Sequence, residues 1–227
     1  MIEHIRKILD VFARNGLFDE GVELVGSWCF YLYQKHFDVK DFPLLTQDVD
    51  FLIPRPFKGR EHEDFIQQFK DIGFRVGHTP NGSLYLWNAE LKIEFIVPQK
   101  GTGLEDTIRI KALGINAVTL RYVDLLLSDA VVIEDGGVKI RIPRPANFAL
   151  QKLIIAPERR KIDKRLKDWQ QAIYVSEAIP PEELKILHAA LPKGWKKKIR
   201  NSLADAQKAL PLLESGINRL RITLQIQ

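Results

Sequence analysis

The sequence has one cysteine, Cys29, among 227 residues. A single cysteine can form neither an internal disulfide nor a zinc site built on several cysteines, so we expect a cytoplasmic protein. Cys29 lies between Trp28 and Phe30, and this apolar setting predicts a small buried hydrophobic residue in preference to a nucleophile.

Long hydrophobic runs and compositional bias are also missing. The most apolar stretches, at 91–98 and 147–157, are broken by charge well short of the roughly 20 residues that cross a bilayer. Residues 1–16 contain acidic residues and lack the apolar core of a signal peptide. With 14 Gly, 12 Pro and 45% hydrophobic residues, the chain is neither collagen-like nor disordered, and we expect one or two globular domains without a membrane segment.

Charge is distributed unevenly along the chain. Residues 1–142 carry 17 Lys and Arg against 21 Asp and Glu, whereas residues 143–227 carry 17 against 8. The basic C-terminal part could bind a polyanion, or it could simply expose charged helix faces to solvent. The sequence changes character at the same point, so we predict two domains, 1–142 and 143–227.

Hydrophobic periodicity predicts an α+β fold, with a small mixed β-sheet flanked by helices and then a helical C-terminal domain. In the first part we expect helices at 2–15, 28–37, 61–73 and 123–129, and strands at 22–25, 48–53, 74–76, 83–87, 91–97, 117–120 and 138–142. In the second part we expect helices at 145–156, 161–176, 181–191 and 195–214. The last residues, 220–227, alternate in a way that could form a strand.

Two carboxylates occur at the start of the second predicted strand. Asp48 and Asp50 are two residues apart, so the alternation of side chains along a strand places both on one face. Like charges at this spacing repel each other unless a cation offsets them, and Mg²⁺ is a hard cation that takes oxygen ligands. The pair therefore indicates a metal site, although capping or solvent-exposed carboxylates would show the same spacing.

A third acid, Glu94, interrupts the most hydrophobic strand of the first part and shares its face with Lys92. Either this face is solvated, or Glu94 reaches the same pocket as Asp48 and Asp50. Three acids on adjacent strands could hold two metal ions, which would lower the pKa of an attacking hydroxyl and neutralise charge on a transferring phosphate.

Gly26 and Ser27 lie between the first predicted strand and the helix that follows it. Glycine allows the backbone to approach a phosphate closely, and the hydroxyl and N–H groups at a helix N-terminus donate hydrogen bonds to phosphate oxygens. An ordinary strand-to-helix turn would have the same sequence, so the pair gains meaning only in combination with the acids that follow it.

The order of LVGS (24–27), QDVDFLI (47–53) and KIEFIV (92–97) resembles the polymerase-beta-like nucleotidyltransferase superfamily. The resemblance covers roughly the first hundred residues, with a longer spacing from Gly26 to Asp48 than in the compact form of the pattern. It implies that Asp48, Asp50 and Glu94 hold two Mg²⁺ ions and that Glu94 helps to deprotonate an acceptor hydroxyl. Gly26 and Ser27 would then bind the β- and γ-phosphates of ATP or another nucleoside triphosphate.

The segment from Pro143 to Ala172 resembles the bacterial nucleotidyltransferase group that includes toxin-type and abortive-infection enzymes. In that group a helix lysine precedes an arginine and a Lys-Asp pair, and the matching residues here are Lys152, Arg160, Lys167 and Asp168. The resemblance implies that Lys152 faces the triphosphate with Lys167 and Asp168 nearby. The spacing leaves Arg159 as an alternative to Arg160, and a basic helix pair packed on the catalytic domain would give the same pattern.

These features together predict an enzyme that transfers a nucleotidyl group from a nucleoside triphosphate to an acceptor hydroxyl and releases pyrophosphate. The acceptor could be RNA, a protein or a small molecule. One alternative is a non-catalytic nucleotide- or nucleic-acid-binding module on the same fold. Another is an interaction protein whose acids only keep its surface soluble.

Two other features lead to weaker predictions. The five histidines lack the spacing of metal ligands, and His62, between Glu61 and Glu63, is expected at an exposed helix start. Residues 193–200 are basic around Trp195 and could contact a nucleic-acid backbone or begin a solvated helix.

Overall fold

The computed structural model describes residues 2–43, 46–101 and 105–226. Within these residues the chain forms two compact units, the first from residues 1–29 and 44–143 and the second from residues 30–43 and 144–227. Helix α2 (Ser27–His36) gives its first three residues to the first unit and the remainder to the second. In the part of the chain that the structure describes, no helix is long and apolar enough to cross a membrane.

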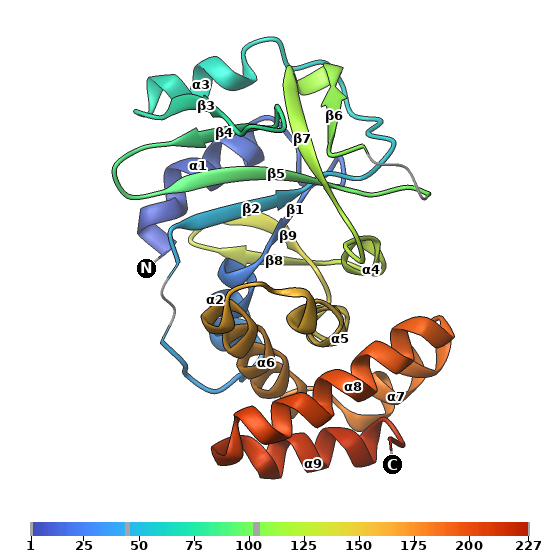
Figure 1. The fold of residues 1–227 in the computed structure, drawn as a ribbon. Helices are drawn as coiled ribbons and strands as arrows, with labels where there is room; N and C mark the ends of the chain where they lie inside the picture. Colours follow the sequence, from blue (N-terminus) through green and yellow to red (C-terminus); the bar gives the residue numbers. More distant parts are fainter. Residues whose placement is uncertain (1, 44–45, 102–104, 227) are drawn as a thin grey trace. The chain divides into compact units, whose positions relative to one another are not determined.

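A mixed sheet forms the centre of the first unit (Figure 1). Its strands, among the described residues, are β1 (Glu23–Val25), β2 (Asp48–Leu52), β3 (Arg75–His78), β4 (Leu84–Trp87), β5 (Lys92–Pro98), β6 (Thr107–Ile110) and β7 (Ile115–Leu120). The order is β1-β2-β5-β4-β3, and β7 pairs with the C-terminal half of β5 and with β6. Strands β2 and β5 are parallel, whereas β1 pairs with β2, and β4 with β5, in antiparallel fashion.

One face of this sheet is covered by helices α1 (Ile2–Arg14) and α3 (Phe65–Asp71) through an aromatic core. The Phe12 ring stacks on Phe51 of β2 with 3.6 Å between ring centroids, and the Phe65 ring lies 6.1 Å from that of Phe95 on β5. Because side chains alternate along a strand, burying these phenylalanines directs the acidic residues of β2 and β5 to the opposite face.

The remainder of the first unit contains a short helix and a hairpin. Helix α4 spans Asp124–Leu127, and β8 (Val131–Asp135) pairs with β9 (Val138–Ile142) in a separate two-stranded sheet. Strands β6 and β8 were not predicted from the sequence. In β8 the first four residues are alternately half-buried and exposed, and only Asp135 is buried. The strand therefore lacks the buried apolar face from which a strand is predicted.

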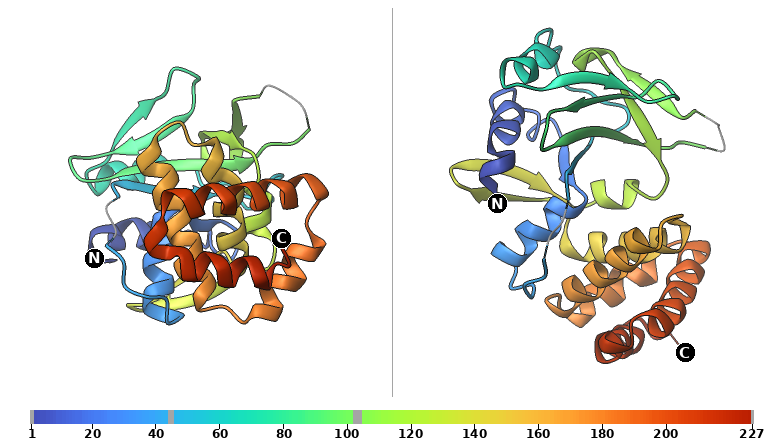
Figure 2. Two further views of the ribbon diagram at one scale, coloured as in Figure 1. Left: turned by 60° about the horizontal axis from the view of Figure 1, so that its bottom comes forward. Right: turned by 60° about the vertical axis from the view of Figure 1, so that its left-hand side comes forward.

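The second unit is helical. Its helices are α5 (Pro145–Ile155), α6 (Ile162–Glu177), α7 (Pro181–Ala190), α8 (Lys193–Ala209) and α9 (Glu214–Thr223), with 3-10 turns at Ala156–Glu158 and Pro211–Leu213. Helices α8 and α9 run side by side (Figure 2). The Trp169 side chain donates its Nε1–H to Ser202 Oγ at 2.8 Å, which joins α6 to α8.

The predicted α+β class is confirmed, while the C-terminal strand is wrong. Residues 214–223 form α9, and the buried side chains of Ile217, Leu220 and Leu224 are three and four residues apart. That spacing is typical of one face of a helix and outweighs the alternation of the last residues. The helix predicted over 195–214 also ends earlier, at Ala209.

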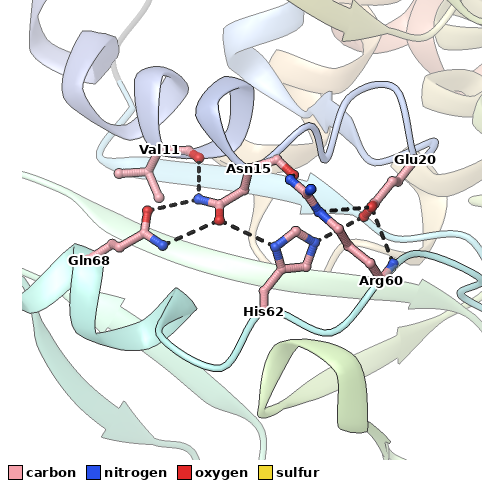
Figure 3. A network of polar contacts seen from close by, with 6 residues as sticks. All are labelled: Val11, Asn15, Glu20, Arg60, His62 and Gln68. Atoms are coloured by element: carbon pink, nitrogen blue, oxygen red, sulfur yellow. Dashed lines mark hydrogen bonds and ion pairs between the residues drawn. The ribbon is translucent and has the colours of Figure 1, made fainter.

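The prediction for His62 is wrong as well. Its side chain is buried and lies between Glu20 and Asn15 (Figure 3). The ring nitrogens Nε2 and Nδ1 lie 3.1 Å from Glu20 Oε2 and 3.3 Å from Asn15 Oδ1, respectively. Gln68 of α3 and Arg60 extend the network to Asn15 and Glu20. The two acidic neighbours of His62 in the sequence suggested exposure, but this tertiary network ties the end of α1 to the segment before α3.

Candidate active site

Gly26 forms the turn between β1 and α2 in the left-handed region, with φ at +74°. A Cβ atom at this position would collide with the Asp50 carboxylate, and Val25, the preceding residue, is paired with Asp50 across the β1/β2 ladder. Both the backbone angle and the close approach of Asp50 therefore require glycine. Ser27 begins α2 and is buried.

The register of β2 and β5 places the three predicted acids on one face of the sheet. Asp50 is opposite Glu94, and Asp48 is opposite Lys92 in the parallel ladder. Residues directly opposite each other point to the same side of a sheet. All four side chains are half-buried, whereas the residues between them, Val49 and Ile93, are completely buried on the other face.

Lys92 is the cation that lies among these acids. Its ammonium forms an ion pair with Glu94 and lies 4.7 Å from the centroid of the Tyr85 ring. Burial lowers the pKa of Lys92, but the hydrogen bond and charge of Glu94 and the charge of Asp48 outweigh this effect, so the pKa is raised above its ordinary value. The lysine therefore stays charged beside the acids.

The donor chemistry of this face fits a hard cation, because aspartate and glutamate oxygens are the ligands that Mg²⁺ prefers. One of these carboxylates, that of Asp50, lies in the space that a side chain on Gly26 would occupy. Among residues 2–43, 46–101 and 105–226, however, the side chains form no group of three or more His, Cys, Asp or Glu that could hold a metal. Glu94 instead makes its ion pair with Lys92.

Two aromatic residues that the sequence analysis did not identify continue this face onto β4. Tyr85 is opposite Glu94, and Trp87 is opposite Lys92. On β3, Gly77 is opposite Tyr85, and a Cβ atom there would collide with the Tyr85 ring. The sequence could have indicated both aromatic residues. Leu84 and Leu86 are the buried residues of the strand, and the alternation places Tyr85 and Trp87 on its other face.

A cavity of about 560 Å³ adjoins the acids on this side of the first unit. It is lined by Asp48 and Lys92, by Tyr85 and Trp87, and by the turns at both ends of β4. The turn from β4 to β5 is well ordered by Asn88, whose Oδ1 accepts hydrogen bonds from the backbone N–H groups two and three residues later.

In the second unit, Lys152 of α5 and Asp168 of α6 form a buried ion pair. Arg159, between the two helices, adds a second ion pair, with its Nε 2.7 Å from Asp168 Oδ2. Burial raises the pKa of Asp168, but the charges and hydrogen bonds of Lys152 and Arg159 outweigh it, so the pKa is lowered from its ordinary value. Asp168 is thus a carboxylate held between two cations.

The structure distinguishes between the two arginines that the spacing left open. Arg159 makes the ion pair with Asp168, whereas Arg160 is exposed at the start of the next segment. Lys167 is half-buried on α6 and precedes Asp168 in the sequence. The sequence had indicated the lysine and the aspartate but could not indicate which arginine faces them.

Comparison with known proteins identifies a family. Residues 3–195 match a family model described as nucleotidyltransferase. No protein of the curated set matches the sequence.

Three solved structures show a distant similarity to this chain. The solution structure of the antibiotic-resistance factor ANT(2'')-Ia is 12% identical to this chain, with a TM-score of 0.44. The match covers 83% of this chain and 91% of the ANT(2'')-Ia chain. A crystal structure of ANT(2'')-Ia in complex with adenylyl-2''-tobramycin has 14% identity and a TM-score of 0.44, covering 83% and 95%. An antigenic nucleotidyltransferase-like protein from Paracoccidioides brasiliensis has 14% identity and a TM-score of 0.47, covering 96% and 93%. The assignment to a family therefore depends on the family model alone.

Proposed function

Because the chain belongs to this nucleotidyltransferase family, we propose that it transfers a nucleotidyl group from a nucleoside triphosphate to an acceptor hydroxyl and releases pyrophosphate. One observation carries the proposal: the Gly26 turn packs directly against Asp50, and Asp50 is opposite Glu94 across the β2/β5 ladder. A backbone suited to phosphate and carboxylates suited to a metal would thus act on one triphosphate.

Gly26 and Ser27 would bind the β- and γ-phosphates. The left-handed turn at Gly26 brings the backbone close to Asp50, and Ser27 begins a helix of 10 residues whose N-terminus is suited to an anion. The partial positive charge at this helix N-terminus would add to the attraction.

Asp48, Asp50 and Glu94 would hold two Mg²⁺ ions, in line with the oxygen donors that the face presents. When bound, the metals supply charge neutralisation at the phosphates and lower the pKa of the acceptor hydroxyl. Glu94 would accept the proton of that hydroxyl, and its ion pair with Lys92 keeps this carboxylate oriented on β5.

Lys152 would offset the charge of the triphosphate from the second unit. Its ion pair with Asp168 fixes the buried ammonium, and Arg159 balances the second oxygen of the same carboxylate. Arg160 and Lys167 would contribute more general positive charge. In this assignment residues 1–142 are the catalytic domain and residues 143–227 the helical domain of a cytoplasmic enzyme.

The test is incubation of the purified protein with each α-labelled nucleoside triphosphate, Mg²⁺ and separate RNA, protein and small-molecule fractions. The wild type should label one fraction, whereas Asp48→Asn/Asp50→Asn should lose at least about 99% of the label, since metal and charge stabilisation supply most of the catalysis. A matched control is Asp163→Asn/Asp205→Asn, which neutralises two exposed acids of the second unit. Nucleotide binding without any labelled product would instead favour a non-catalytic binding module.

A further inference from the structure

The cavity beside the acids lies on one particular side of them. In the sheet order β1-β2-β5-β4-β3, the Gly26 turn follows β1, the three acids are on β2 and β5, and the cavity extends along β4. The acids therefore lie between the turn and the cavity. This order matters because transfer at the α-phosphorus places the attacking oxygen and the leaving pyrophosphate on opposite sides.

If Gly26 and Ser27 hold the β- and γ-phosphates on the β1 side, the acceptor must approach from the β4 side. We propose, as an extension of the function proposed above, that the cavity along β4 is the acceptor site and that Trp87 and Tyr85 form its binding surface. The occupant is a compact hydroxyl compound with a flat or apolar ring face, uncharged or positively charged.

The size of the cavity supports a small acceptor. Its volume of about 560 Å³ is within the range of roughly 300–1,000 Å³ that is typical of small-molecule sites. Trp87, at the end of β4, is 39% exposed although Leu86 before it is completely buried, and the Trp87 ring lines the cavity. Aromatic surfaces of this kind bind ring compounds by stacking and cations through the ring face.

The charge of the lining argues against a polyanionic acceptor. Asp48 and Glu90 line the cavity, and the lysine that lines it, Lys92, is paired with Glu94. Arg75 lies over Trp87, with its guanidinium carbon 5.6 Å from the ring centroid, on the outer strand of the sheet. A nucleic acid needs several cations along its path, whereas the lysine in this lining is already paired with a carboxylate.

The shape of the binding surface depends on Gly77. The Tyr85 ring occupies the space in which a side chain on Gly77 would lie, and the Lys92 ammonium covers the ring from the neighbouring strand. The ring is thus fixed before any ligand binds, and so is the turn after β4 through Asn88. A preformed surface of this kind loses little entropy on binding.

The experiment combines transfer kinetics with a binding measurement that needs no transfer. Wild type, Trp87→Ala, Trp87→Phe and Leu120→Ala are assayed with an α-labelled nucleoside triphosphate and a small-molecule cell extract. Leu120 is the matched control, since it is 40% exposed and lies on β7 of the same sheet. In parallel, saturation-transfer NMR records which compounds of the same extract bind each variant without nucleotide.

We expect label in the small-molecule fraction, an acceptor KM raised about tenfold in Trp87→Ala, partial rescue by Trp87→Phe and an unchanged KM for the triphosphate. The NMR signals of bound ring compounds should weaken in Trp87→Ala and persist in Leu120→Ala. Label only on RNA or protein, an unchanged acceptor KM, or a rise in the triphosphate KM instead would overturn the acceptor site. No label from the wild type, together with NMR signals that depend on Trp87, would refute nucleotidyl transfer and leave the binding site standing.

Discussion

The acidic face of the first unit and the ion-pair cluster of the second are built in opposite ways. On the sheet, three acids accompany one lysine, Lys92, which pairs with Glu94. Between α5 and α6, two cations surround the single carboxylate of Asp168. The first arrangement suits added positive charge and the second suits added negative charge. The comparison therefore separates a region of the first unit that would attract a cation from a region of the second unit that would attract an anion.

The largest stability effect is expected when the carboxylate of the second unit is neutralised. Asp168→Asn leaves the buried Lys152 ammonium without its counter-ion, and we expect a loss of about 3–5 kcal/mol in the free energy of unfolding. Asp50→Asn in the first unit should cost less, because it relieves repulsion among like charges. Urea denaturation measures both, with Asp163→Asn on the exposed surface of α6 as a control. Equal losses at Asp168 and Asp50 would contradict the comparison.

A third carboxylate, that of Glu23, shows how burial and pairing with a cation act in opposite directions on the pKa of an acid. Glu23 on β1 is completely buried, and its Oε1 lies 3.3 Å from Arg141 Nε. Burial outweighs the charge and hydrogen bond of Arg141 and raises the pKa of Glu23 from 4.5 to about 7. A single partner is therefore insufficient here, whereas Asp168 has two.

The raised pKa of Glu23 predicts a pH dependence. The folded protein holds the Glu23 proton more tightly than the unfolded chain does. The contribution of this proton to the free energy of unfolding is therefore complete below pH 4.5 and is lost as the pH rises to about 7. The loss should amount to about 3 kcal/mol at most. Glu23→Gln removes it, so the difference in unfolding free energy between wild type and variant should change across this interval. Parallel pH profiles would show that Glu23 does not titrate there.

Replacing Lys92 should have the smallest of these effects, and it should be a gain in Mg²⁺ binding where the other substitutions cause a loss. Its ammonium lies among the proposed metal ligands and repels a cation, so Lys92→Met should strengthen Mg²⁺ binding by about twofold to fivefold. Isothermal titration with Mg²⁺ measures the change, and Lys100→Met outside the site provides the control. Weaker Mg²⁺ binding in Lys92→Met would contradict this expectation and mean that orienting Glu94 matters more for the metal than the repulsion by the ammonium.

The same comparison shows which parts of the site the sequence could predict. Asp48 and Asp50, and likewise Lys92 and Glu94, share a face because the strand period is two, and this much follows from local spacing. The resemblance implied that Glu94 shares a metal site with Asp48 and Asp50, whereas the register that places Glu94 opposite Asp50 comes from the β2/β5 ladder. The location of these residues on neighbouring strands could therefore be predicted from the sequence.

Other parts depend on tertiary contacts that spacing does not determine. Arg159 and Arg160 are adjacent in the sequence, and only the path of the chain between α5 and α6 decides which one meets Asp168. Trp87 joins the acidic face only because β4 pairs with β5 in one register. His62 is buried by partners that are 42 and 47 residues away. Local pattern could not supply these contacts.

The most direct test of the account is the effect of Mg²⁺ on stability. Unfolding free energies of wild type and Asp48→Asn/Asp50→Asn are measured without the metal and with Mg²⁺ at about one hundred times its dissociation constant. Binding to the folded state alone should stabilise the wild type by about 2.7 kcal/mol and leave the variant unchanged. An equal shift in both proteins, or none in the wild type, would contradict a metal site on the acidic face.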